Sequence, residues 1–416
     1  MLWLFLFVFK FIVCSILISI QLFFYRFLRQ QFVSVGSSQR ITRILQSVLV
    51  TFSIPLVFIL FDNGWIAHLP AGLTGTILTP VYCWHFSWFL IFLFISVEYG
   101  IQRFLEMVRW IVKKVAIRKN PHPLIQNTFQ PTRRKFIRQS FLAATGTVFS
   151  TAAYGALAHD HFALSRLTVP IRDLPDDFDG FTIALLSDIH SSIFMPRATM
   201  QNYVNATNTL RPDMIAVTGD FVNSMVDEVY PFAEAFSSLA APSGVFGVLG
   251  NHDYYTRNVE AVAKVVGECG IRLFRNQHIL LNKKNSAIVL GGIDDVGYAD
   301  KATRLTDLAM NGSPEHITKI LLSHRPYFFP EFSSRNIDLT LSGHTHGGQI
   351  VLARFGNYVI APAQMASPYV AGLYTLGQSK MYVSRGIGTI VVPIRVNCPP
   401  EITLITLRSS PDGSAV

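Results

Sequence analysis

The sequence predicts an α/β domain preceded by a helical membrane region. Short β-branched runs in the second half of the chain each end in polar residues and alternate with helix-compatible stretches, which is typical of an α/β sheet. The first hundred residues instead contain apolar runs long enough to cross a bilayer. Half of the 416 residues are hydrophobic and the mean hydropathy is +0.35, which is too apolar for a purely soluble protein.

Three apolar runs predict about three transmembrane helices within residues 1–100. Each run is close to the roughly 20 residues that a helix needs to cross the bilayer core. A single Lys10 interrupts the first. The runs are Leu2–Tyr25, Ile44–Phe61 and about Pro80–Val97.

Basic residues are concentrated beside the predicted spans. Residues 1–100 carry a net charge of +3, residues 101–138 carry +9, and the remaining chain sums to −3. Because positive residues mark cytoplasmic segments, we expect the stretch between the first two spans and a basic linker at 101–139 to lie in the cytoplasm. The mildly acidic remainder argues against nucleic acid as the main partner.

The segment 140–158 has two interpretations. Arg133-Arg134 precedes a weakly apolar stretch that ends in Ala156-Leu157-Ala158, and this pattern resembles a twin-arginine export signal with a cleavage site. The alternative is a fourth membrane span with basic flanking residues. Both interpretations place the following domain, residues 165–408, on the extracytoplasmic side of the inner membrane of a multi-pass protein. Residues 409–416 are predicted to form a disordered tail.

Polar residues at the carboxyl ends of the strand-like runs predict a metal site. Ligand sites gather at this edge of α/β sheets. Carboxylate, imidazole and amide oxygen suit Mn, Fe or Zn. This domain has two cysteines, Cys269 and Cys398, which are too few for a thiolate site. The i, i+2 pairs, Asp188 with His190 and His344 with His346, are expected to project to one side of an extended segment. The polar residues are Asp188, His190, Asp220, Asn251, His252, Asp253, His324, His344 and His346.

The order of these residues resembles the calcineurin-like metallophosphoesterase superfamily. The blocks DIH, GD, GNHD, the histidine of LLSHRP, and GHTHGG occur in order between Asp188 and Gly348, and the resemblance extends over about Leu167–Leu407. It implies a four-layer α/β/β/α sandwich. The preceding membrane helices and the twin-arginine-like segment are similar to those of a bacterial subgroup of cell-envelope phosphoesterases.

The resemblance also implies two divalent metal ions. The two ions would lie about 3.5 to 4 Å apart. Together they would neutralise phosphoryl oxygens and activate a water for in-line displacement. Asp220 would bridge them. One metal would be held by Asp188, His190, Asp220 and His346, and the other by Asp220, Asn251, His324 and His344.

Three further residues are candidates for catalysis and substrate binding. His252 follows the Asn251 ligand and is expected to donate a proton to the leaving-group oxygen, oriented by Asp253. Arg325 has two interpretations, because its guanidinium either binds a substrate phosphate or pairs with an acidic side chain.

These residues predict a dinuclear metal-dependent phosphoesterase acting at the cell envelope, with hydrolysis of a phosphodiester, a pyrophosphate or a phosphomonoester left open. Asp220 precedes Phe221-Val222-Asn223-Ser224 in place of the Asp-Arg-Gly sequence of protein phosphatases, which disfavours a protein substrate. A membrane-tethered domain favours a phospholipid or lipid precursor, and a phosphorylated small molecule stays open. The alternatives are an enzyme similar to the UDP-2,3-diacylglucosamine pyrophosphohydrolases and a non-catalytic metal-binding membrane sensor. The sequence does not give the oligomeric state.

Overall fold

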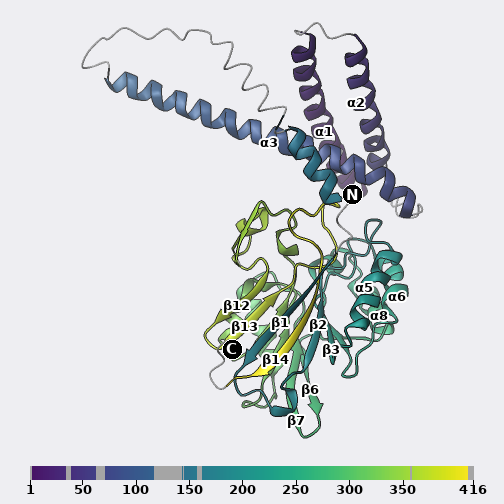
Figure 1. Ribbon diagram of the computed structural model, residues 1–416, viewed down its shortest axis with the longest axis vertical. Coiled ribbons are helices and arrows are strands. Elements are labelled where there is room, and N and C mark those ends of the chain that lie inside the picture. Colours follow the sequence, from purple (N-terminus) through teal and green to yellow (C-terminus); the bar gives the residue numbers. More distant parts are fainter. Residues whose placement is uncertain are drawn as a thin grey trace. The chain divides into compact units, whose positions relative to one another are not determined.

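The computed structural model divides the chain into two units, Met1–Tyr154 and Gly155–Val416. It describes residues 2–33, 39–61, 71–116, 143, 145–156, 162–356 and 358–410. The described part of the first unit is helical, and the second contains both strands and helices (Figure 1).

Within its described residues, the first unit contains three helices that are long and apolar enough to cross a membrane: α1 (Leu2–Val33), α2 (Gln39–Leu60) and α3 (Ala71–Ala116). This confirms the prediction of N-terminal apolar helices that could span a bilayer. The predicted boundary between spans and linker at residues 100 and 101 falls inside α3. Gly100 stands at this boundary, and a single glycine lowers the stability of a helix without necessarily ending it.

Buried polar side chains join the three helices of the first unit. The Gln21 amide nitrogen lies 2.9 Å from Nδ1 of His85, and Nε1 of Trp84 donates to the Gln21 amide oxygen at 3.2 Å. Nε2 of His85 lies 3.0 Å from the carbonyl oxygen of Phe52 on α2. Hydrogen bonds of this kind stabilise helix association in an apolar environment.

The segment 140–158 is described only in part. Residues 145–156 are helical. Arg133, Arg134 and Ala158 lie outside the described residues, so the choice between an export signal and a fourth span stays a prediction.

The second unit is built on two six-stranded sheets. The first has the order β1-β14-β2-β3-β4-β5 and the second β12-β13-β9-β8-β7-β6. The strands of the first sheet are β1 (Ala163–Ile171), β14 (Glu401–Ser409), β2 (Thr182–Leu186), β3 (Met214–Val217), β4 (Val245–Gly247) and β5 (Ile271–Leu273). Those of the second are β12 (Gly372–Leu376), β13 (Ser379–Val383), β9 (Leu339–Ser342), β8 (Lys319–Leu322), β7 (Ser286–Gly292) and β6 (Gln277–Lys283).

Helices cover the outer faces of both sheets. Those beside the first sheet are α5 (Arg197–Thr209), α6 (Val229–Phe236) and α8 (Val259–Glu268), and those beside the second are α9 (Ala299–Met310) and α10 (Phe329–Ser333). A short helix, α7 (Asn251–Tyr255), follows β4, and β10 (Ala353–Phe355) pairs with β11 (Tyr358–Ile360) as a separate hairpin.

Alternating side chains produce the four layers. In β2, Ile183 and Leu185 join a core shared by the two sheets, whereas Ala184 and Leu186 pack with the helices of the first sheet. Because side chains of a strand point alternately to opposite faces, a strand buried on both faces has the continuous apolar sequence seen here. The predicted α/β/β/α sandwich is therefore confirmed.

The last strand extends the domain beyond its predicted end. Ser409 belongs to β14, where it is paired with Ile171 of β1, and the Ser410 amide donates to the Ile171 carbonyl at 3.2 Å. Placing Ser409 and Ser410 in a disordered tail was therefore wrong, because β14 is paired on both sides. Residues 411–416 lie outside the described residues.

Candidate metal centre

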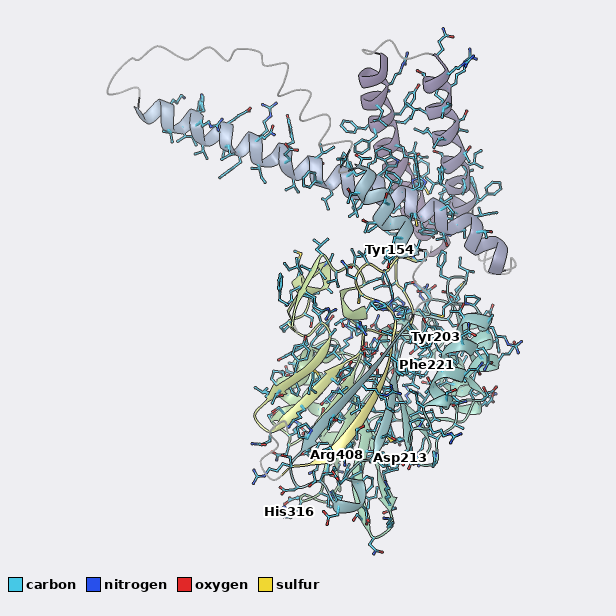
Figure 2. All side chains as sticks on the ribbon, viewed as in Figure 1. Tyr154, Tyr203, Asp213, Phe221, His316 and Arg408 are labelled. Atoms are coloured by element: carbon cyan, nitrogen blue, oxygen red, sulfur yellow. The ribbon has the colours of Figure 1, made fainter. Side chains whose placement is uncertain are left out.

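The predicted ligands lie in the turns that follow the carboxyl ends of adjacent strands. Asp188 follows β2, Asp220 follows β3 and Asn251 begins α7 after β4. His324 follows β8 and His344 follows β9 in the other sheet. Figure 2 labels Phe221, the neighbour of Asp220, apart from Asp213 and Arg408.

The backbone at these ligands is strained. Left-handed φ angles cost a side-chain-bearing residue about 1 to 3 kcal/mol each and persist where the surrounding structure enforces them. This conformation corrects the expectation of extended i, i+2 pairs, because left-handed residues turn successive side chains in different directions. The strained ligands are Asp188 (52°), His190 (49°), Asp220 (55°), His344 (72°) and His346 (51°).

Two glycines allow the ligand turns to approach one another. A Cβ atom on Gly250 would overlap the Asp220 carboxylate, and a Cβ on Gly343 would overlap the side chains of Ser187 and Asp188. Any other residue at either position would displace a predicted ligand.

The first donor group consists of Asp188, His190 and His346, whose ligating atoms all lie within 4.8 Å of one another. Nε2 of His190 lies 3.1 Å from Nε2 of His346, which lies 3.5 Å from Oδ1 of Asp188. The Asp188 carboxylate also accepts the backbone N–H of His344, at 2.9 Å to Oδ1.

The second donor group consists of Asp220, His324 and His344, with Asn251 beside them. Nε2 of His324 lies 3.1 Å from both Oδ1 of Asn251 and Nδ1 of His344. Nδ1 of His324 lies 2.7 Å from the Thr218 carbonyl oxygen, which fixes its proton there and leaves the Nε2 lone pair facing the other donors.

Asp220 joins the two groups. Its Oδ2 lies 3.5 Å from Nε2 of His190 and 3.2 Å from Nε2 of His324, while its Oδ1 accepts the backbone N–H of His252 at 2.8 Å. One carboxylate oxygen thus lies between a nitrogen of each group. Buried imidazole nitrogens that converge on carboxylate and amide oxygens fit a pair of divalent cations.

The electrostatics of the site keep several imidazoles neutral. Burial lowers the pKa of His344 to about 2 and that of His346 to about 4, so both have lone pairs at neutral pH. Burial opposes protonation of His324 as well, but Asp220 beside it raises the pKa of His324 to about 10. A proton and a metal therefore compete for Nε2 of His324.

Asp253 does not orient His252, which corrects the sequence interpretation. The Asp253 carboxylate accepts backbone N–H groups of Asp220, Phe221, Val222 and Gly250 at 2.8 to 3.2 Å. It lies in the first turn of α7, where it holds the turn that contains Asp220. The carbonyl oxygen of Asn223 is instead the partner of Nδ1 of His252, whose ring lies 4.5 Å from that of His190.

Arg325 pairs with an acidic side chain, which is one of its two sequence interpretations. Its Nε and Nη2 donate to the two carboxylate oxygens of Asp295 at 2.7 and 2.9 Å. Aromatic rings lie nearby, because Tyr327 stacks edge-on against His344 and Tyr255 lies 5.0 Å from His252. The two tyrosines and Asp295 have no motif that would have singled them out.

Sequence reasoning also missed a buried cation beneath the ligand turns. Arg395 is 3% exposed, and its guanidinium donates to backbone carbonyls. The acceptors belong to Arg385, Gly386, Gly388 and Cys398 at 2.9 to 3.3 Å, and to the His346 ligand at 3.5 Å. Nothing local in the sequence indicates this role, since the acceptors come from separate loops.

The fold and donor set define the class of protein, and comparison with known proteins agrees. The family model of calcineurin-like phosphoesterases matches residues 181–348. Metallophosphoesterase YkuE of Bacillus subtilis is 30% identical over 293 residues, which cover 67% of this chain and 98% of that protein. The chain belongs to the calcineurin-like metallophosphoesterase family, and its second unit is a phosphoester hydrolase domain.

Two further relatives differ in how much of their length is matched. A transmembrane protein with metallophosphoesterase domain from Danio rerio is 32% identical over 285 residues, covering 66% of this chain and 63% of that protein. Phosphodiesterase YaeI of Escherichia coli is 28% identical over 277 residues, covering 65% of this chain and 98% of that protein. The match thus leaves more than a third of the Danio rerio protein uncovered.

Proposed function

We propose that this chain is a dinuclear metal-dependent phosphodiesterase acting on a phosphorylated lipid or lipid precursor of a bacterial cell envelope. The position of Asp220 carries the proposal, because one of its oxygens lies between nitrogens of both donor groups. The diester preference is supported by the similarity to a protein named phosphodiesterase. The complete donor set disfavours a non-catalytic sensor.

Different residues of the site have different roles in hydrolysis. When bound, two divalent cations supply charge neutralisation at the phosphoryl oxygens and activation of the attacking water. The seven predicted ligands at the strand ends would hold these cations, and Asp220 would be shared between the two donor groups. As an imidazolium, His252 would donate its Nε2 proton to the leaving-group oxygen, because the Asn223 carbonyl accepts the Nδ1 proton and keeps it on that nitrogen.

The membrane helices support a lipid substrate and an extracytoplasmic location for the domain. By the distribution of basic residues, the domain lies on the extracytoplasmic side of the inner membrane. A UDP-2,3-diacylglucosamine substrate is cytoplasmic and fits this topology poorly.

Hydrolysis by the purified full-length chain in detergent tests the proposed function. With Mn²⁺ we expect cleavage of bis-p-nitrophenyl phosphate in preference to p-nitrophenyl phosphate, and loss of both activities with a chelator. Restoration by Mn²⁺, Fe²⁺ or Zn²⁺ identifies the metal. Absence of turnover in a protein that binds two metals contradicts the proposal.

The variant His252→Ala is expected to lower kcat for an alkyl phosphodiester by about 10² to 10⁴-fold, because the alkoxide needs a proton as it leaves. The loss is expected to be much smaller for p-nitrophenyl esters, whose leaving group is stable without one. Steady-state kinetics on both esters measure the contrast. The control is His316→Ala, which changes an exposed histidine labelled in Figure 2. Equal losses on both esters would remove the proton-donor role.

The variant Arg325→Lys is expected to raise KM by about tenfold with little change in kcat, because lysine cannot keep the two-point contact with Asp295 and hold a substrate phosphate as well. Arg335→Lys disrupts a similar pair with Asp307 at the surface and is the matched control. An unchanged KM would leave Arg325 with a purely structural role.

A further inference from the structure

A surface of the second unit exposes large apolar side chains beside the metal centre. We refer to these residues as the apolar rim. Single exposed apolar residues are ordinary on a protein surface, whereas a group on adjoining loops marks an interaction site. The apolar rim consists of Leu352, Phe355, Ile360, Met365 and Val391, with exposed fractions of 73, 68, 45, 94 and 84%.

The hairpin that carries most of the rim is amphipathic. Val359 is fully buried, whereas the adjacent Ile360 is 45% exposed. Successive residues of a strand face opposite sides, so in β11 the Val359 side packs into the domain and the Ile360 side faces outward. The register of the hairpin places Phe355 on the same face as Ile360. The packed side is a small core of Val351, Val359, Ala361, Val370 and Cys398.

The fold holds Val391 outward at an energetic cost. Val391 has a φ of 62°, a conformation that β-branched residues rarely adopt, and Val392 N–H donates to the Ile390 carbonyl at 2.6 Å. The Gln349 amide clamps this turn from both sides. It donates to the carbonyls of Ile390 and Val392 at 3.0 and 3.1 Å and accepts the Ile390 N–H at 2.9 Å.

The apolar rim is continuous with the turn that carries a metal ligand. Gln349 directly follows the 3-10 turn His346–Gly348. A Cβ on Gly348 would lie 2.6 Å from that of Ala361 at the end of the hairpin, so the ligand turn and the hairpin are in direct contact. A molecule seated on the rim therefore lies next to the metal centre.

The charge around the rim suits an anionic surface. The sequence contains no Asp or Glu between Asp338 and Glu401, and the hairpin carries the exposed Arg354. Apolar side chains next to a basic residue are typical of segments that lie in the interface of an anionic bilayer.

We propose that the apolar rim inserts into the surface of the bilayer that holds the membrane helices, and so presents amphiphilic phosphoesters to the metal centre. This inference rests on the proposed function for its substrate. A lipid surface is favoured as the occupant because the same chain contains three helices that could span a membrane.

Photocrosslinking in the reconstituted full-length protein tests the proposal. The photoreactive residue p-benzoylphenylalanine replaces Phe355 or Met365, and the matched controls replace Tyr298 or Leu308, which are 61 and 55% exposed on the same domain. We expect mass spectrometry to detect phospholipid adducts at the rim positions and none at the control positions. Adding phosphatidylglycerol to phosphatidylcholine vesicles is expected to raise the adduct yield about fivefold, and Arg354→Gln to remove that increase.

Glutamate substitutions on the rim provide a second test of bilayer insertion. With the photoreactive residue at Met365, the double variant Leu352→Glu/Phe355→Glu is expected to abolish the lipid adduct, whereas Tyr298→Glu/Leu308→Glu retains it. Both variants are expected to keep wild-type turnover of the soluble ester. Absence of lipid adducts at both rim positions, or adducts to a second copy of the chain in their place, overturns the proposal.

The two proposals fail in distinguishable ways. Soluble ester hydrolysis without lipid adducts contradicts the inserted rim and leaves the phosphoesterase function standing. Lipid adducts at the rim of a protein that hydrolyses no ester contradict the phosphoesterase function and leave the inserted rim standing.

Discussion

Asp220→Asn reduces metal-dependent hydrolysis by about 10³-fold or more, because one substitution affects both donor groups. The neutral amide removes the charge that both cations would share. In one orientation it also directs an N–H toward Nε2 of His190 and His324, which lie 3.5 and 3.2 Å from Oδ2. We expect the metal content, measured by plasma mass spectrometry, to fall together with kcat.

The control for this prediction is Asp213→Asn. Asp213 accepts two hydrogen bonds from Thr182 at 2.8 Å, at the end of the strands away from Phe221 (Figure 2). The Asp213→Asn protein is expected to bind both metals and to have activity near the wild-type level. An Asp220→Asn protein that retains two metals and full activity would show that Asp220 does not bridge the site.

Arg395→Met is expected to destabilise the second unit by about 3 kcal/mol, because several buried carbonyls lose a charged donor together. For a domain of this size that corresponds to a fall in Tm of roughly 6 to 12 °C. One of the carbonyls belongs to the His346 ligand and two others belong to Gly386 and Gly388, which pack on Asp188 and Ile189. Metal affinity is therefore expected to fall as well.

Thermal unfolding followed by near-ultraviolet circular dichroism, with and without Mn²⁺, measures both effects. The matched control is Arg408→Met, which removes a surface ion pair with Asp179. The Arg408 side chain is 51% exposed, so this variant is expected to change Tm little. An unchanged Tm and metal content in Arg395→Met would contradict the positioning role of this cation.

Much of the fold follows from local pattern. The continuous apolar runs of β2, β3, β8 and β9 predicted buried strands, whereas the two sheets with helices outside them were implied by the family resemblance. The helix-compatible stretches between the strand-like runs contribute to α5, α6, α8 and α9. The continuation of α3 beyond residue 100 was not predicted, since the boundary was placed by a change in charge, and α3 also continues through Pro80 and Gly100.

The sequence by itself determined which residue types surround the metal centre and in what order, because each ligand lies in the turn that follows a strand whose pattern is local. The tertiary structure alone decided what the neighbouring groups do. Asp253 holds the Asp220 turn, Arg325 pairs with Asp295, and Arg395 holds the His346 turn. These partners are brought together by the packing of separate strands and loops, and no spacing along the chain records such contacts.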